Sequence, residues 1–274
     1  MQRRPFFGWT IAAVSGLGLA TGIATIVAAT FSIFVGPIRE EFGWSASLPF
    51  WAPLAVTLTT AIAAPWVGSF VDRYGARRIV LVSFVLEALI LLSFYWHTPS
   101  IWGFYLRYVA LGAFALGTTH IAFARVIAMW FDRRRGLALG IALAGVGIGG
   151  MLLPLLCQAL IGAAGWRAAY VGLAAVIVFV TLPVLALTLR DSPADLGLRV
   201  DGDDPAEADL RATPSASAPP AGLTLEQARQ DPFYWTMLLT FLLIGIGLQS
   251  VMLHLVPMLR SRGVDPMLAA TAQS

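Results

Sequence analysis

Titratable and charged residues inside apolar stretches are the residues of this chain whose types suggest chemistry. Five of them stand in such stretches: Glu87, Arg107, His120, Arg125 and His254. Each is costly to place in hydrocarbon, so a residue of this kind is by default a candidate for ligand binding or proton transfer. An arginine offers a permanent positive charge to an anion, and a histidine changes its charge near neutral pH. The set is therefore where ligand binding or proton transfer is to be sought first.

The apolar run 101–130 carries three of the five. Arg107 and Arg125 are eighteen residues apart, and on a helix with 3.6 residues per turn they point the same way. Both also suit a snorkelling role at the two ends of a span, with the charge in the headgroup layer. Arg125 is the preferred anion ligand because it lies deeper than the boundary that Trp130 marks, and Arg107 is the alternative. His120 lies nearer the middle, where ligand binding, proton relay and a structural hydrogen bond are the alternatives.

Polar residues of two other apolar runs extend this set. Gln249 and His254 stand five residues apart in the last run, where they are candidates for the same anion site. Glu87 stands in the third run. Its carboxyl group must be protonated, paired with Arg107 or His120, or held as a proton-binding site. A structural pair is the preferred interpretation, and a proton-coupling role is the alternative.

Several kinds of chemistry find no support in the sequence. The single cysteine, Cys157, stands in an apolar run and allows no disulfide within one chain. There is no His-x-x-x-His or Cys-x-x-Cys spacing, no phosphate-binding glycine loop and no nucleophile elbow. We therefore expect no metal site, no cofactor and no enzymatic activity.

The elements that must position these residues are long apolar segments. The chain of 274 residues is 58% hydrophobic and 12% charged, whereas about 25% of residues are charged in soluble domains. Runs of about 20 apolar residues meet the criterion for a transmembrane helix. Seven spans are predicted, near 9–36, 48–70, 79–96, 101–130, 137–162, 168–189 and 233–258. The expected fold class is an all-α membrane protein embedded in the lipid bilayer.

The distribution of arginine predicts the orientation, because the chain contains no lysine. With the N-terminus in the cytoplasm, the inside segments carry twelve arginines and the outside segments four. The inside set is Arg3, Arg4, Arg73, Arg77, Arg78, Arg133, Arg134, Arg135, Arg190, Arg199, Arg211 and Arg229, and the outside set is Arg39, Arg167, Arg260 and Arg262. This positive-inside bias predicts a multi-pass protein of the inner (cell) membrane with a cytoplasmic N-terminus. The net charge of +3 follows from topology and does not imply binding of nucleic acid.

Composition divides the chain into three parts. Six spans joined by short loops occupy 1–190. Residues 191–232 are polar and rich in Pro, Ala, Ser and Asp, so we expect a flexible cytoplasmic linker there. Residues 233–274 hold the seventh span and the first turns of an eighth helix.

A stripe of small residues predicts a packing face on the fifth span. Gly136, Gly140 and Ala144 recur every four positions. Such a stripe lets two membrane helices approach each other closely.

The loop between the second and third spans carries the most specific motif. It reads Gly68-Ser69-Phe70-Val71-Asp72-Arg73-Tyr74-Gly75-Ala76-Arg77-Arg78. The pattern Gly-x-x-x-Asp-Arg-x-Gly-x-Arg-Arg resembles the cytoplasmic signature of the major facilitator superfamily, between its second and third helices. The resemblance implies a conformational latch, in which Asp72 faces the N-terminus of a helix in the other half and Gly68 permits that contact. The motif is completed by Arg73, Gly75, Arg77 and Arg78.

Further segments resemble the monocarboxylate transporters and bacterial oxalate:formate antiporters of that superfamily. The stretch before and into the fifth span reads Trp130-Phe131-Asp132-Arg133-Arg134-Arg135-Gly136-Leu137-Ala138-Leu139-Gly140, which matches an aromatic-Phe-x-x-Arg-Arg-x-Leu-Ala-x-Gly pattern. Phe42-Gly43-Trp44-Ser45 and Gly165-Trp166-Arg167 are similar to the same group. The resemblance implies a secondary carrier of small organic anions such as monocarboxylates, working by proton-coupled symport or by exchange. In that family the fourth and seventh helices border the central cavity.

Members of the resembled family have twelve spans, and this chain shows seven and part of an eighth. The resemblance therefore implies a fragment or a truncated product of a carrier that works by alternating access. The alternative is a transporter-like membrane scaffold or sensor that binds partners and moves nothing. The expected partners of a carrier are a small organic anion, protons as the coupling ion and the lipid bilayer.

Overall fold

The computed structural model describes residues 6–45, 47–202 and 225–261, apart from the side chains at 225, 246 and 248–261. All regular elements of this described part are helical, which confirms the all-α fold class. The chain forms two compact units, Met1–Ala208 and Asp209–Ser274. The predicted division at 190 and 232 stays a prediction.

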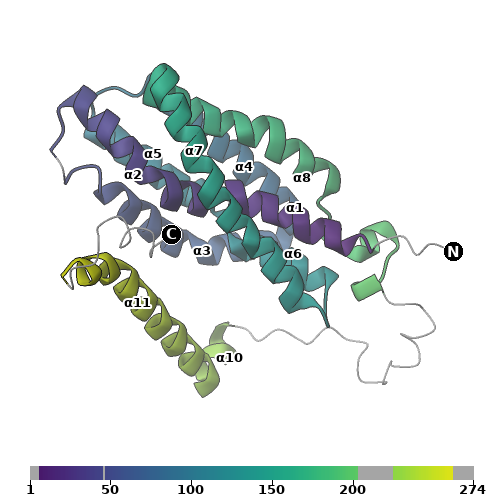
Figure 1. Ribbon diagram of the computed structural model, residues 1–274. Coiled ribbons are helices and arrows are strands. Elements are labelled where there is room, and N and C mark those ends of the chain that lie inside the picture. The colour runs from purple at the N-terminus through teal and green to yellow at the C-terminus, as the bar shows by residue number, and fades with distance from the viewer. Residues whose placement is uncertain (1–5, 46, 203–224, 262–274) are drawn as a thin grey trace, which may run out of the picture. The chain divides into compact units, whose positions relative to one another are not determined.

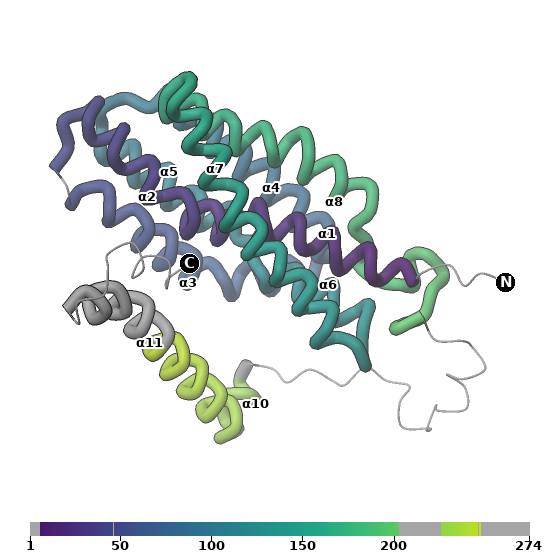
Figure 2. Tube along the Cα trace, viewed as in Figure 1, coloured from purple at the N-terminus to yellow at the C-terminus, as the bar shows by residue number. Residues whose placement is uncertain are grey.

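The first unit is a bundle of long helices that lie lengthwise against one another (Figures 1 and 2). The helices follow the chain in the order α1 (Gly8–Thr21), α2 (Ile23–Phe42), α3 (Trp51–Tyr74), α4 (Ala76–Ser93), η1 (Phe94–Trp96), α5 (Ile101–Phe114), η2 (Leu116–Thr118), α6 (His120–Trp130), α7 (Arg135–Val176), η3 (Ile177–Thr181), α8 (Leu182–Thr188), η4 (Pro193–Leu196) and η5 (Val200–Gly202). Among these, η3 is a single π-helical turn that joins α7 to α8.

Apolar composition and length fit these helices to a membrane. The stretches long and apolar enough to cross it are Gly8–Phe42, Trp51–Tyr74, Ala76–Trp96 and Arg135–Thr188. The last covers 54 residues and turns at Gly165, whose φ of 83° suits glycine, so it holds two of the predicted spans. The predicted span 101–130 is represented by shorter helices because it is broken between α5 and α6.

The core of the first unit depends on close contact between α1 and α7. A Cβ atom on Gly145 would collide with the carbonyl oxygen of Gly16, and one on Gly149 would collide with that of Ala20. Small residues therefore do bring α7 against another helix, as expected. The predicted stripe is on a different face, because Cβ atoms on Gly136 and Gly140 would meet nothing within 4 Å among the described residues.

Residues 191–202, the first part of the predicted linker, fold into short turns. Ser192 and Asp195 form a capping box at the start of η4. Asp201 Oδ2 accepts hydrogen bonds from the backbone N–H groups of Asp132 (3.1 Å) and Arg133 (2.8 Å), in the loop between α6 and α7. Residues 203–224 of that linker lie outside the described residues.

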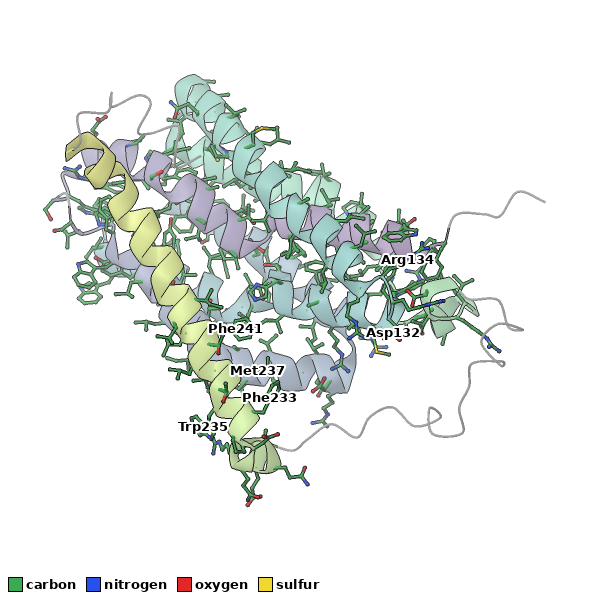
Figure 3. All side chains as sticks on the ribbon, turned by 60° about the horizontal axis from the view of Figure 1, so that its bottom comes forward. Asp132, Arg134, Phe233, Trp235, Met237 and Phe241 are labelled. Atoms are coloured by element: carbon green, nitrogen blue, oxygen red, sulfur yellow. The ribbon has the colours of Figure 1, made fainter. Side chains whose placement is uncertain are left out.

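The second unit contains α10 (Leu225–Gln230) and α11 (Pro232–Ser261). Its large apolar side chains include Phe233, Trp235, Met237 and Phe241, as expected for a helix in an apolar environment (Figure 3). The helix covers the predicted seventh span, near 233–258.

Candidate functional site

Two membrane helices of the first unit are broken near their middles. Between α1 and α2, Gly22 takes an extended conformation with φ −76° and ψ 161°. Between α5 and α6, the turn η2 is followed by Thr119, which is also extended, with φ −86° and ψ 171°. Each break frees backbone N–H and C=O groups that an uninterrupted helix would pair internally.

The two breaks meet at Thr118. The Ile23 N–H donates to Thr118 Oγ1 over 3.1 Å, and Thr118 Oγ1 donates to the Ala115 carbonyl over 2.7 Å. A Cβ atom on Gly22 would collide with the Thr118 carbonyl oxygen, so only glycine allows this approach. The junction of Gly22, Ile23 and Thr118, here called the break junction, fixes the first and fourth spans to each other.

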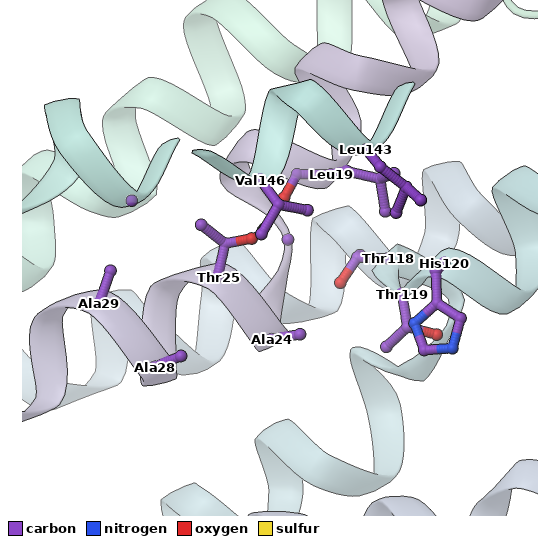
Figure 4. A pocket seen from close by; sticks show the side chains of 12 residues that line it. Leu19, Ala24, Thr25, Ala28, Ala29, Thr118, Thr119, His120, Leu143 and Val146 are labelled. Atoms are coloured by element: carbon purple, nitrogen blue, oxygen red, sulfur yellow. The ribbon is translucent and has the colours of Figure 1, made fainter. Parts of the chain in front are cut away.

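A pocket of about 450 Å³ opens beside the break junction (Figure 4). It is lined by residues of three segments, namely the α1–α2 break, the start of α6 and the middle of α7: Leu19, Gly22, Ala24, Thr25, Ala28, Ala29, Thr118, Thr119, His120, Leu143, Val146 and Gly150. None of these lining residues is Asp, Glu, Lys or Arg. His120 is the one lining residue with an ionisable side chain.

The starts of α2 and α6 give this pocket a positive electrostatic character. Gly22 and Thr119 are the N-cap residues of α2 and α6, and neither makes a side-chain capping bond. The first N–H groups of a helix point out of its N-terminus and carry partial positive charge. Half-helix N-termini of this kind hold anionic groups in broken membrane helices. The arrangement can therefore bind a small anion, with the His120 imidazole at its side.

The predicted site residues of the fourth span are thus separated in space. His120 lines the pocket, but Arg125 and Arg107 do not. Arg125 forms an ion pair with Asp72 of the signature loop, so its charge is already balanced. That Arg125 binds the anion stays a prediction.

Arg107 belongs to a cluster of aromatic and polar residues at the opposite end of the bundle. Its guanidinium donates to Ser93 Oγ (3.1 Å), His97 Nδ1 (3.1 Å) and the Gly103 carbonyl (2.9 Å). It also lies 5.7 Å from the centre of the Phe94 ring. These contacts fit the snorkelling interpretation, because they bind the positive charge of Arg107 near the end of the bundle and away from the pocket.

His97 in this cluster is buried between cationic groups. Burial, followed by the charges of Arg107 and Arg167, lowers the pKa of His97 to about 4. Arg167 is itself paired with Glu41 over 2.7 Å and donates to the His97 carbonyl over 3.2 Å. The cluster therefore joins the end of α2, the start of α5 and the turn of α7 at Gly165 around a neutral imidazole.

Glu87 is enclosed within the bundle. It is 0% exposed, and neither carboxyl oxygen has a hydrogen-bond partner among the described residues. The predicted structural pair with Arg107 or His120 is therefore absent from the described structure. The Thr118 hydroxyl acts electrostatically on the Glu87 carboxyl group.

The signature loop is held by residues beyond its own motif. Gly75 ends α3 and starts α4 with a φ of 87°, and its N–H donates to the Val71 carbonyl. The Arg77 N–H donates to Asp191 Oδ1 over 2.7 Å, and Arg77 Nη2 donates to the Ala186 carbonyl over 2.7 Å. The start of α4 is thereby tied to the end of α8.

The remaining motif residues face outward. A Cβ atom on Gly68 would meet no described residue within 4 Å, and Arg73 lies 5.3 Å from the centre of the Tyr74 ring. Arg78 is exposed. Gln249 and His254 lie in α11, where their side chains are outside the described residues.

Sequence reasoning missed Gly22, Thr118 and Asp191. A glycine and a threonine inside apolar runs are common in membrane helices and drew no attention. The signal was the polar sequence Gly117-Thr118-Thr119-His120, which interrupts an otherwise apolar span at its middle. Asp191 stands at the end of the sixth span, where its negative charge contrasts with the inside arginines.

Comparison with known proteins places the chain among membrane transporters. Human monocarboxylate transporter 11 is 30% identical over 261 residues, which are 94% of this chain and 50% of that protein. Monocarboxylate transporter 13 of Bos taurus is 28% identical over 269 residues, or 97% of this chain and 58% of that protein. The uncharacterised MFS-type transporter YcxA of Bacillus subtilis (strain 168) is 31% identical over 169 residues, or 60% and 40%.

The chain spans about half the length of the curated relatives that it matches. The family model described as Major Facilitator Superfamily matches residues 17–274, which is nearly the whole chain. That match agrees with the broken apolar helices and with the signature loop between α3 and α4. The protein belongs to the major facilitator superfamily.

Proposed function

We propose that this chain is part of a secondary active transporter that moves small organic anions, such as monocarboxylates, by alternating access. The observation that carries the proposal is that the starts of two helices, α2 and α6, lie at one pocket, where their N-cap residues Gly22 and Thr119 belong to the lining. Two relatives named as monocarboxylate transporters support the same substrate class. Coupling to protons, by symport or by exchange, belongs to the proposal.

The size and polarity of the pocket support a small substrate. Its volume of about 450 Å³ falls within the range of small-molecule sites. Thr25 and Thr119 donate their hydroxyl hydrogens to Leu19 and Leu116 carbonyls, so they present mainly acceptors and apolar surface. Recognition of a carboxylate then depends on the helix N-terminal N–H groups and on His120.

The proposed orientation has the N-terminus in the cytoplasm and the protein in the inner membrane. One end of the bundle gathers Arg77, the Trp130 contact to the Arg190 carbonyl and the arginines of the α6–α7 loop. The other end gathers Glu41, His97 and Arg167. The end that is richer in arginine is expected on the cytoplasmic side of the membrane. A reporter fused at Ser215 should therefore read out as internal.

Anion binding is the direct test of the proposal. Purified chain in lipid nanodiscs is titrated calorimetrically with lactate, and with its uncharged amide as the matched control. Lactate should bind and the amide should not, because the amide lacks the charge that the helix N-termini attract. His120→Ala should weaken lactate binding several-fold. Binding that is equal for lactate and its amide would contradict an anion site.

Variants of the two arginines separate their roles. Arg125→Gln and Arg107→Gln are compared with His120→Ala in the same titration. A ligand arginine would lose lactate affinity when its charge is removed, whereas a structural arginine would mainly lower expression. Unchanged affinity in both arginine variants would leave the helix N-termini and His120 as the anion ligands.

Uptake into vesicles distinguishes a carrier from a scaffold or sensor. Vesicles containing the chain should accumulate labelled lactate when an inward proton gradient is applied, if this part transports. Binding without uptake would favour the scaffold or sensor alternative for the chain as it stands.

A further inference from the structure

Glu87 is an isolated carboxyl group in the middle of a membrane helix. It lies eleven residues from Ala76 and nine from Trp96, or roughly 16 Å and 14 Å from the two ends of that helical stretch. It is 0% exposed, and neither oxygen has a hydrogen-bond partner among the described residues. A negative charge held there without a partner would be strongly unfavourable.

The charged and titratable groups on the helices around α4 make no bond to Glu87 among the described residues. The elements packed against α4 are α3, α5, η1, η2, α6, α7, α8 and η3. Their titratable groups are Asp72, Arg73 and Tyr74 on α3, Tyr95 on η1, Tyr105, Arg107 and Tyr108 on α5, His120 and Arg125 on α6, and Arg135, Cys157, Arg167 and Tyr170 on α7. Asp72 is paired with Arg125, and Tyr108 with Tyr170 over 2.8 Å. Within the described residues, none of these groups forms an ion pair or a hydrogen bond with Glu87.

Glu87 is close to the break junction because α4 packs against η2, the turn that ends at Thr118. The Thr118 hydroxyl acts electrostatically on the Glu87 carboxyl group. The Thr118 hydroxyl donates its hydrogen to the Ala115 carbonyl over 2.7 Å, and the hydroxyl oxygen accepts a hydrogen bond from the Ile23 N–H over 3.1 Å. A neutral carboxylic acid is compatible with this arrangement, whereas a carboxylate would compete for the Thr118 hydrogen.

We propose that Glu87 is the proton-binding residue of this half, neutral in the conformation described, and that loss of its proton loosens the break junction. The proton leaves to water, and the Thr118 hydroxyl then turns from the Ala115 carbonyl to the Glu87 carboxylate. The Ile23 N–H loses its acceptor, so the start of α2 shifts at the wall of the pocket. The effect on the pocket rests on the proposed anion site. The assignment of a proton to Glu87 does not depend on that site.

Infrared spectroscopy of the chain in lipid bilayers tests the proton directly. At neutral pH the wild type should show the carbonyl stretch of a protonated carboxylic acid, with the usual shift in deuterium oxide. Glu87→Gln should remove that band. Glu41→Gln is the matched control, because Glu41 is paired with Arg167, and it should leave the band unchanged. A wild type without the band, or a band that survives Glu87→Gln, would overturn the assignment.

The dependence of lactate binding on pH tests the coupling. Lactate affinity of the wild type should fall by up to tenfold per pH unit once Glu87 begins to lose its proton, and Glu87→Gln should lose this part of the pH dependence. The variant keeps the shape of the neutral acid, so its thermal unfolding midpoint should match that of the wild type at neutral pH. A variant that retains the wild-type pH dependence would overturn the coupling. Absence of lactate binding in the wild type would overturn the proposed function and the coupling with it. The infrared band would still show whether Glu87 carries a proton.

Discussion

At the scale of single residues, Thr118 shows best why part of the site escapes sequence reasoning. It is 1% exposed and uses its hydroxyl both as donor and as acceptor. A threonine in an apolar run is expected to bond to its own helix one turn back. Here the donor is Ile23, 95 positions away along the chain, so the pairing depends on tertiary packing. His120 was recognisable because an ionisable side chain in hydrocarbon always needs an explanation.

Thr118→Val should destabilise the protein by about 1–3 kcal/mol, because the Ile23 N–H would be left buried without an acceptor. The free energy of unfolding in mixed detergent micelles measures the effect. Thr118→Ser keeps the hydroxyl and is the matched control, with a much smaller loss expected. Equal stability of the two variants would show that the Ile23 bond contributes little.

Asp72→Asn should leave folding nearly unchanged and reduce transport strongly. The side chains of Arg125 and Asp72 are 46% and 65% exposed, so their ion pair contributes under about 1 kcal/mol to stability. A latch that must close and open in each cycle depends on that charge, which the amide lacks. Uptake is measured in a transport-competent protein that carries this half, with membrane insertion as the control. The exchange Asp72→Arg with Arg125→Asp should restore part of the activity if the pair itself is what matters, and wild-type uptake by Asp72→Asn would refute the latch.

At the scale of elements, the sequence predicted where helices lie better than where they break. The predicted spans 48–70 and 79–96 correspond to α3 and to α4 with η1, because continuous apolar runs fix their length. The break at Gly22 leaves its apolar run uninterrupted, and the break at Thr119 is marked only by the short polar sequence 117–120. The packing face of α7 was also mispredicted within the described residues, since its glycines form several stripes and only the neighbour decides which one is used.

Gly149→Ala should destabilise the bundle, whereas Gly147→Ala should not. A Cβ atom at Gly149 would collide with the Ala20 carbonyl, and one at Gly147 would meet nothing within 4 Å among the described residues. Overpacking of a rigid contact costs about 1–3 kcal/mol. Alanine in an open helical position instead gains up to about 1 kcal/mol over glycine. Thermal unfolding midpoints of the two variants should therefore move in opposite directions, and a common direction would contradict the close contact of α1 with α7.

At the scale of the whole first unit, the two ends of the bundle are stabilised by different means. One end is tied by Asp191, which accepts from the start of α4, and by the Trp130 contact to the Arg190 carbonyl. The other end is closed by the aromatic cluster around His97, where Glu41 and Arg167 are paired. The first depends on permanent charges and backbone groups, and the second depends on an imidazole that stays neutral.

Acid should therefore weaken the end that contains His97. Its pKa is about 4 in the folded protein and 6.5 in the unfolded chain, so between these values the unfolded state binds the extra proton. Stability is unaffected by His97 above pH 6.5 and is lost as the pH falls towards 4, by up to about 3 kcal/mol at 1.4 kcal/mol per unit. Unfolding free energies measured across this range should show the loss in the wild type and a smaller one in His97→Gln. An equal acid sensitivity of the two proteins would assign the effect to other groups.

The absence of Asp, Glu, Lys and Arg from the lining of the pocket affects whether the pocket prefers singly or doubly charged anions. The energy of removing an ion from water rises with the square of its charge, so a dianion loses about four times as much solvation as a monoanion. Its attraction to the dipoles at the starts of α2 and α6 only doubles. A site built from dipoles without a fixed cation therefore favours singly charged anions over doubly charged ones of similar size. An arginine in the pocket would reduce that preference. Arg125 instead forms an ion pair with Asp72, which leaves the preference for monoanions intact.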